Sequence, residues 1–157
     1  MNIVEKFINI IGEYISYLIP LMTLLMIIVI VSRYFFGIGQ TGLQELVMYF
    51  HALVFLGCAG YAFNKDEHVR VDIFYRDASD KYKNVINLIF GVIFLLPVTF
   101  IIVFYSIELI SMSWKIRETS TEAGGLGYVF IQKTFIFLFP LTLFAAFINQ
   151  LIKIIWK

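Results

Sequence analysis

Four long apolar stretches occupy most of this chain of 157 residues, and the charged residues gather mainly between them. A helix rises 1.5 Å per residue, so about 20 apolar residues cross the roughly 30 Å hydrocarbon core of a membrane. Hydrophobic residues make up 61% of the sequence, more than a water-soluble chain of this size can bury. The pattern therefore predicts an all-α integral membrane protein rather than a soluble domain.

The apolar stretches predict four transmembrane helices. The first has no charged residue between Tyr14 and Ser32, and the second holds one, Glu45, near its beginning. Pro97 and Pro140 lie inside the last two spans, where neighbouring helices can satisfy the carbonyl groups that a proline leaves free, so kinks are expected there. The predicted spans cover about 14–36, 43–63, 85–114 and 129–155, with a middle loop at 64–84, in a single membrane domain of residues 1–157.

Basic residues in the connecting segments predict the orientation of the spans. Eight of the twelve lie on the side of both termini and the middle loop: Lys6, Lys65, Arg70, Arg76, Lys81, Lys83, Lys153 and Lys157. The other side carries four: Arg33, Lys115, Arg117 and Lys133. Because cytoplasmic segments carry an excess of Lys and Arg, we expect both termini and the middle loop in the cytoplasm (N-in/C-in).

The N-terminal segment does not have the pattern of a cleaved signal peptide. Glu5 and Glu13 flank the single Lys6, and no small-residue cleavage site follows the apolar run. The first span is therefore expected to stay in the protein. These features predict a multi-pass membrane protein.

The residue inventory argues against several classes of protein. The single cysteine, Cys58, excludes an internal disulfide, and His51 and His68 lie too far apart along the chain to ligate one haem iron in one subunit. The sequence has no phosphate-cradling glycine loop, metal-ligand cluster or nucleophile elbow. We therefore expect no enzyme activity, no cofactor, no metal and no nucleic-acid partner, and His51 is interpreted as a hydrogen-bonded packing residue.

Four charged residues are expected at one depth, near the outer ends of the spans. Arg33 ends the first span, Glu45 begins the second, Glu108 falls in the last turns of the third and Lys133 in the first turns of the fourth. Ionisable groups at membrane depth are costly and are usually paired, so these residues are candidates for a layer that fixes helix or subunit docking. The alternative is that the two bases extend to lipid headgroups while the acids are solvated.

The middle loop carries the densest pattern of charges, from Asn64 to Tyr75. Apolar and charged residues alternate from Val69 to Ile73, which is typical of a short extended segment. The same run is compatible with the start of an amphipathic interfacial helix, with Arg70 facing lipid phosphates. Membrane lipids are therefore expected partners of this loop.

Three segments carry a resemblance to a known family: the run Leu43-Gln44-Glu45-Leu46, the helix with Phe55-Leu56-Gly57 and the element Glu67-His68-Val69-Arg70-Val71-Asp72. They resemble the small membrane subunit (DctQ type) of tripartite ATP-independent periplasmic (TRAP) transporters. Arg33-Tyr34 looks like the family's first helix end, and Gly124-Gly125-Leu126 followed by Lys133 looks like its entry to the fourth helix. Many small subunits have a tryptophan and two acids where this chain has Leu43-Gln44-Glu45, so only Glu45 carries over. Four runs resemble the branch of the family labelled for mannitol or chloroaromatic compounds: Gln44-Glu45-Leu46, Tyr49-Phe50-His51, Ile73-Phe74-Tyr75 and Ser113-Trp114.

The resemblance implies a multi-pass protein of the bacterial inner (cytoplasmic) membrane that works within a larger transporter. In this family a periplasmic substrate-binding protein (DctP type) captures the solute, and a large membrane subunit (DctM type) holds the sodium and substrate sites. The small subunit packs against the large one as a scaffold, so the chain is expected to serve a sodium-coupled importer of an organic carboxylate: a 2-oxo acid, another monocarboxylate, a C4-dicarboxylate or sialic acid. The candidate structural and partner-interface residues are Arg33, Glu45, His68, Arg70, Asp72, Glu108 and Lys133.

Two other classes of function remain as alternatives. A self-contained four-helix exporter would dimerise around a membrane-embedded glutamate, whereas Glu13 and Glu108 lie toward the ends of their spans. A membrane enzyme would need titratable groups that converge at one level, and the only candidate set is Glu67, His68, Arg70 and Asp72.

Overall fold

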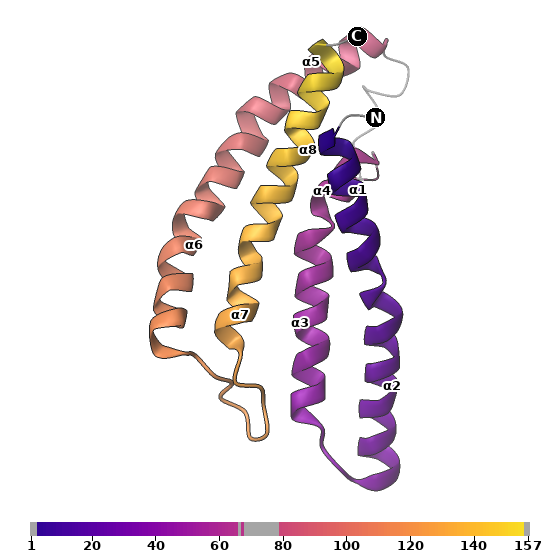
Figure 1. Ribbon diagram of the computed structural model, residues 1–157, viewed down its shortest axis with the longest axis vertical. Helices are drawn as coiled ribbons and strands as arrows, with labels where there is room; N and C mark the ends of the chain where they lie inside the picture. The colour runs from indigo at the N-terminus through magenta and orange to yellow at the C-terminus, as the bar shows by residue number, and fades with distance from the viewer. Residues whose placement is uncertain (1–2, 66, 68–78, 156–157) are drawn as a thin grey trace.

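The computed structural model describes residues 3–65, 67 and 79–155, and within this part of the chain the regular structure is entirely helical (Figure 1). Four helical segments are long and apolar enough to cross a membrane: Ile3–Phe36, Thr41–Asn64, Lys81–Ile116 and Val129–Ile154. The prediction of an all-α fold with four such helices is confirmed. The first and third segments begin closer to the N-terminus than the predicted spans did.

The first two segments form a helical hairpin, and each contains a break. They consist of α1 (Ile3–Ser16), α2 (Leu18–Phe36), α3 (Thr41–Gly57) and α4 (Ala59–Asn64). The breaks fall at Tyr17 and Cys58. Gly37 ends α2 with a φ of 68°, and the N–H of Ile38 closes the turn on the carbonyl of Ser32 at 3.0 Å.

The last two segments form a second hairpin with two irregular turns. They consist of α5 (Asp80–Phe90), the π-helical turn η2 (Gly91–Leu95), α6 (Leu96–Ile116), α7 (Val129–Thr134), the 3-10 turn η3 (Phe135–Phe137) and α8 (Leu138–Ile155). A proline gives no N–H to the carbonyl four residues earlier, and its ring crowds that carbonyl. For Pro97 that residue is Ile93 in η2, and for Pro140 it is Ile136 in η3. The expected disturbances therefore take the form of a π turn and a 3-10 turn.

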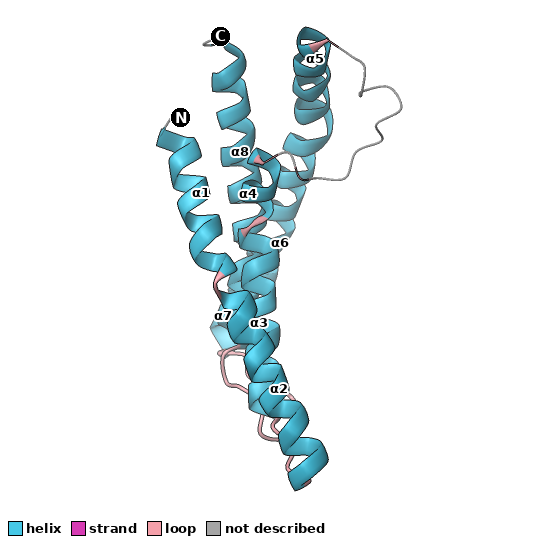
Figure 2. Cartoon of the chain, turned by 90° about the vertical axis from the view of Figure 1, so that its right-hand side faces the viewer, coloured by secondary structure: helices cyan, strands magenta, loops and turns pink. Residues whose placement is uncertain are grey.

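Both termini lie at one end of the bundle with the start of α5, and we call this the terminal end (Figure 1). Residues 37–40 and 117–128 connect the helices at the opposite end, the loop end. The helix α8 is central, because it packs against α1, α3, α4 and α6. Figure 2 shows the same elongated bundle from the side.

Close packing around α8 depends on small residues. A Cβ atom on Gly60 of α4 would lie 2.2 Å from the carbonyl oxygen of Thr142 on α8, so only glycine permits this approach. The N–H of Gly60 also donates to the hydroxyl of Thr142 at 3.3 Å. The side chains of Ala146, Phe147 and Asn149 on α8 are almost fully buried. The core therefore runs along α8, where it contacts both hairpins.

The outer surface of the bundle is largely apolar. On α6, Phe100 and Phe104 are exposed, whereas the polar side chains of Thr99, Ser106 and Ser113 face inward. This is the reverse of a water-soluble helix, and it suits a helix whose outer face meets hydrocarbon or another membrane helix.

Candidate functional site

A group of polar residues joins two helices, α3 and α7, to the 117–128 loop at the loop end. We call it the loop-end cluster: the side chains of Glu45, Glu118, Ser120 and Lys133, with the backbone N–H of Leu126. Its two carboxylates hold the loop at different points. One binds from α3, and the other connects the loop to α7.

Glu45 lies in the first turns of α3 and accepts two hydrogen bonds from the loop. The hydroxyl of Ser120 donates to one carboxylate oxygen, and the N–H of Leu126 donates to the other at 2.6 Å. The loop closes on itself between these donors, because the N–H of Ser120 donates to the carbonyl of Leu126 at 2.9 Å. A Cβ on Gly125 would lie 2.7 Å from the carboxylate of Glu45, so glycine at this position lets the acid approach.

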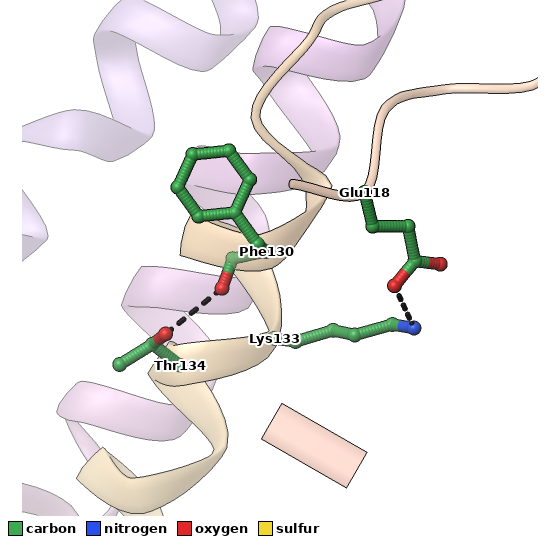
Figure 3. Close-up of polar contacts among 4 residues, drawn as sticks. All are labelled: Glu118, Phe130, Lys133 and Thr134. Atoms are coloured by element: carbon green, nitrogen blue, oxygen red, sulfur yellow. Dashed lines mark hydrogen bonds and ion pairs between the residues drawn. The ribbon is translucent and has the colours of Figure 1, made fainter. Parts of the chain in front are cut away.

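Glu118 and Lys133 form the ion pair of the cluster. Figure 3 shows the ammonium group of Lys133 donating to the carboxylate of Glu118 at 2.5 Å, with both side chains just over a quarter exposed. Glu118 lies in the loop, and its pKa falls below the ordinary glutamate value because Lys133 donates to its charged form. The pair therefore connects the loop to α7.

An aromatic contact packs α6 against α7 at the loop end. Phe130 is buried, and its ring meets the ring of Trp114 edge-on with centroids 4.8 Å apart. The indole N–H of Trp114 donates to the hydroxyl of Thr134 at 2.9 Å. That hydroxyl donates to the carbonyl of Phe130 at 2.8 Å (Figure 3). Arg117 places its guanidinium 5.8 Å from the centre of the Phe130 ring.

Arg33 makes a separate contact within the first hairpin. Its guanidinium donates to the side-chain oxygen of Gln44 at 3.3 Å, and Arg33 itself is exposed. The contact joins the end of α2 to the start of α3. The structure therefore places Arg33 beside Gln44, while its neighbour Glu45 binds the loop instead.

Glu108 does not join the loop-end cluster. Its side chain is exposed on α6, and no hydrogen bond or ion pair among the described residues involves its carboxylate. Lys133 pairs with Glu118, which the sequence analysis did not single out. The three loop candidates His68, Arg70 and Asp72 lie outside the residues that the structure describes.

Polar contacts also join the helices at the terminal end. Lys153 of α8 donates to the carboxylate of Glu5 on α1 at 2.8 Å. The amide of Asn149 on α8 donates to that of Asn64 on α4 at 3.0 Å, and Asn149 is only 1% exposed. These pairs were not predicted, since they link residues more than 80 positions apart.

The described residues carry no grouping typical of a metal centre. In residues 3–65, 67 and 79–155, no three His, Cys, Asp or Glu side chains are placed to hold a metal ion. Cys58, at the break between α3 and α4, is a free, half-buried thiol that contacts the carbonyl of Gly12 on α1 at 3.7 Å. The described contacts join helices and a loop within the chain.

Comparison with known proteins gives one family. The sequence model described as tripartite ATP-independent periplasmic transporters, DctQ component, matches residues 22–156. This range contains Arg33, Gln44 and the whole loop-end cluster. No curated protein and no solved structure matches the chain.

Proposed function

Since the chain belongs to the DctQ family and is thus the small subunit of a TRAP transporter, we propose that it is the scaffold of a sodium-coupled importer of an organic carboxylate. It is a multi-pass inner-membrane protein with four candidate spans. In the tripartite system, components of this family work with a DctM-type membrane subunit and a DctP-type binding protein. The observation that carries the proposal is the family match over residues 22–156.

The contacts within the chain support a scaffold role. At the loop end, Glu45 and the Glu118–Lys133 pair hold the long 117–128 loop against α3 and α7. At the terminal end, the Glu5–Lys153 pair joins the first helical segment to the last. A subunit fixed at both ends is suited to holding a moving partner in place.

We propose that the terminal end faces the cytoplasm, because eight of the twelve basic residues belong to the termini and the middle loop. The loop-end cluster would then face the periplasm, on the side of the DctP-type binding protein. In the same proposal, Arg33 and Glu45 order the outer layer, and His68, Arg70 and Asp72 order the cytoplasmic loop against lipid headgroups or the large subunit. Glu108, exposed on α6, would contact headgroups or a partner.

The substrate class rests on the resemblance of Gln44-Glu45-Leu46 and Ser113-Trp114 to the mannitol or chloroaromatic branch. Binding proteins of that branch include ones for 2-oxo acids and other monocarboxylates, so an organic carboxylate is the proposed solute. Sodium coupling belongs to the large subunit in this proposal.

Reconstitution tests the proposed function directly. The large subunit and the binding protein are placed in proteoliposomes with a sodium gradient, with and without this chain, and uptake of labelled carboxylates is measured. We expect uptake only when this chain and the gradient are both present. Equal uptake without the chain would contradict the scaffold role, and uptake by this chain alone would support the self-contained exporter. Replacing sodium by potassium on both sides is the control for coupling.

A further inference from the structure

His51 occupies an unusual position for a polar side chain. It is the eleventh of the 24 residues in Thr41–Asn64, which places it about 15 Å from the start of that helical segment. The segment as a whole is about as long as the hydrocarbon core is thick, so His51 lies near the middle of the membrane. A polar group at that depth normally faces the inside of a bundle.

In this subunit the His51 side chain faces outward. It is exposed, and its ring stacks on that of Phe55 with centroids 6.3 Å apart. No hydrogen bond or ion pair among the described residues uses the imidazole. The same helix buries Tyr49, which lies two positions and therefore about 200° away around the helix, so packing of that face leaves the His51 ring on the surface.

A groove lies beside His51 between α2 and α3. It has a volume of about 570 Å³ and is lined by Met22, Thr23, Met26, Ile27, Val47, Met48 and His51. The hydroxyl of Thr23 already donates to the carbonyl of Ile19 at 3.1 Å. Apart from the imidazole, the surface of the groove is therefore apolar. Its methionine side chains can adapt to the shape of a bound partner.

We propose that this groove receives a transmembrane helix of the large subunit, and that a side chain of that helix hydrogen-bonds His51. A lipid chain fits the apolar part of the groove, but it has no group that can pair with an imidazole in the membrane core. A helix supplies both apolar side chains and a hydrogen-bonding group such as a hydroxyl, amide or carboxyl. This inference rests on the proposed function, in which the chain assembles with the large subunit, and it names the face of the chain that makes the contact.

The outer face of α6 is the competing surface, because it exposes Glu108. That acid lies eight residues before Ile116, near one end of a helical segment of 36 residues. The segment is much longer than a core of roughly 30 Å, so its ends extend toward the headgroups. The polar residues Thr99, Ser106 and Ser113 of α6 face inward. His51 is therefore the stronger marker of a protein contact at mid-depth.

Photo-crosslinking in the intact complex tests the proposal. Met48 in the groove and Met112 on α6 are both 60% exposed, so they form a matched pair of positions for a benzophenone amino acid. We expect a crosslink to the large subunit from position 48 and none from position 112. A crosslink from position 112 alone, from both positions or from neither would overturn the assignment of this face. A crosslink from position 48 to lipid or to a second copy of this chain would also overturn it.

Substitutions test the role of the imidazole. His51→Leu should weaken recovery of the large subunit about tenfold, whereas His51→Gln, which keeps a hydrogen-bonding group, should retain most of it. Met48→Trp should block the groove, and Met112→Trp should not. Each variant is first shown by gel filtration and circular dichroism to be folded. Full recovery with both His51→Leu and Met48→Trp would contradict the proposal. If the unaltered chain recovers no large subunit, the proposed assembly itself fails, and the docking face with it.

Discussion

Glu45 receives hydrogen bonds from two points of one loop, the hydroxyl of Ser120 and the N–H of Leu126. A carboxylate used in this way fixes backbone, which a headgroup-facing acid would not do. Lys133 likewise pairs with Glu118 in the loop at 2.5 Å. At the scale of the residue, the charges at the loop end therefore secure a connection within the subunit.

The carboxylate of Glu45 should stabilise the loop in a measurable way. Glu45→Ala removes both acceptors, so we expect Tm in detergent to fall by several degrees and the 117–128 loop to become sensitive to protease. Glu45→Gln keeps one acceptor oxygen, so its Tm should lie between those of Glu45→Ala and the unaltered chain. Glu122→Ala is the matched control, because Glu122 is an exposed acid of the same loop. Equal stability of all four proteins would contradict this role.

The Glu118–Lys133 pair predicts a dependence of stability on pH. Lys133 lowers the pKa of Glu118 in the folded protein, so the stabilisation is present above the unfolded pKa and is lost as pH falls through the folded one. The difference in Tm between the unaltered chain and Glu118→Gln should therefore shrink from about pH 7 to about pH 3. Thermal unfolding in detergent measures it, with Glu122→Gln as the control. A difference that stays constant over this range would exclude the ion pair as its cause.

The sequence predicted the charged positions at the loop end better than their partners. Arg33, Glu45 and Lys133 were identified because charge is rare near the ends of apolar spans. The partners Gln44, Glu118 and Ser120 were missed, since pairing across a loop depends on how the loop folds back. For Glu118 there was a usable signal, because it follows the third span and precedes Lys133 by only 15 residues.

At the scale of the element, hydropathy predicted four long helices and not their interruptions. The first helix continues to Ile3, beyond the predicted start near residue 14, although Glu13 and Lys6 add charge there. Its ion pair between Glu5 and Lys153 shows that this extension packs on α8. Hydropathy averages over many residues, so it does not register a break at Tyr17 or Cys58.

Packing between α4 and α8 makes Gly60 a sensitive position. Gly60→Ala places a Cβ against the backbone of Thr142, which cannot move aside without separating the helices. We expect the free energy of unfolding to fall by about 1–3 kcal/mol. Gly39→Ala is the control, because a Cβ on Gly39 meets nothing within 4 Å. Denaturation in mixed micelles measures the free energy of unfolding of both variants. An equal loss of that free energy in Gly60→Ala and Gly39→Ala would contradict packing as the cause.

At the scale of the whole molecule, the two ends differ in character. The terminal end joins distant segments through Lys153 and Asn149. The loop end has shorter connections, and carboxylates secure the longer of them. The side between them, formed by α2 and α3, carries the groove beside His51. Anchoring and docking therefore occupy different regions of one small subunit.

The proposed orientation predicts which end a membrane-impermeant thiol reagent reaches. In a Cys58→Ala background, Glu122→Cys at the loop end should react in intact spheroplasts. Lys65→Cys at the terminal end should react only after permeabilisation, because the proposed orientation puts that end, with its excess of basic residues, in the cytoplasm. Both residues are exposed, so access rather than burial decides the result. The reverse labelling pattern would show that the chain crosses the membrane in the opposite direction.

The π turn at Gly91–Leu95 has a consequence for how this subunit can diverge. The N–H of Leu96 donates to the carbonyl of Gly91, five residues back, so the turn holds one residue more than an α turn. Deleting one residue there would leave a regular α-helix and would keep α5 and α6 in nearly the same rotation, because the wide turn already absorbs the extra residue. A deletion elsewhere in α5 or α6 would instead rotate one part of the helix against the other by about 100°. Gly91 itself has to stay, because a Cβ there would lie 2.0 Å from the ring of Phe147. We therefore expect lineages that differ in length along this span to gain or lose the residue within this turn, outside Gly91.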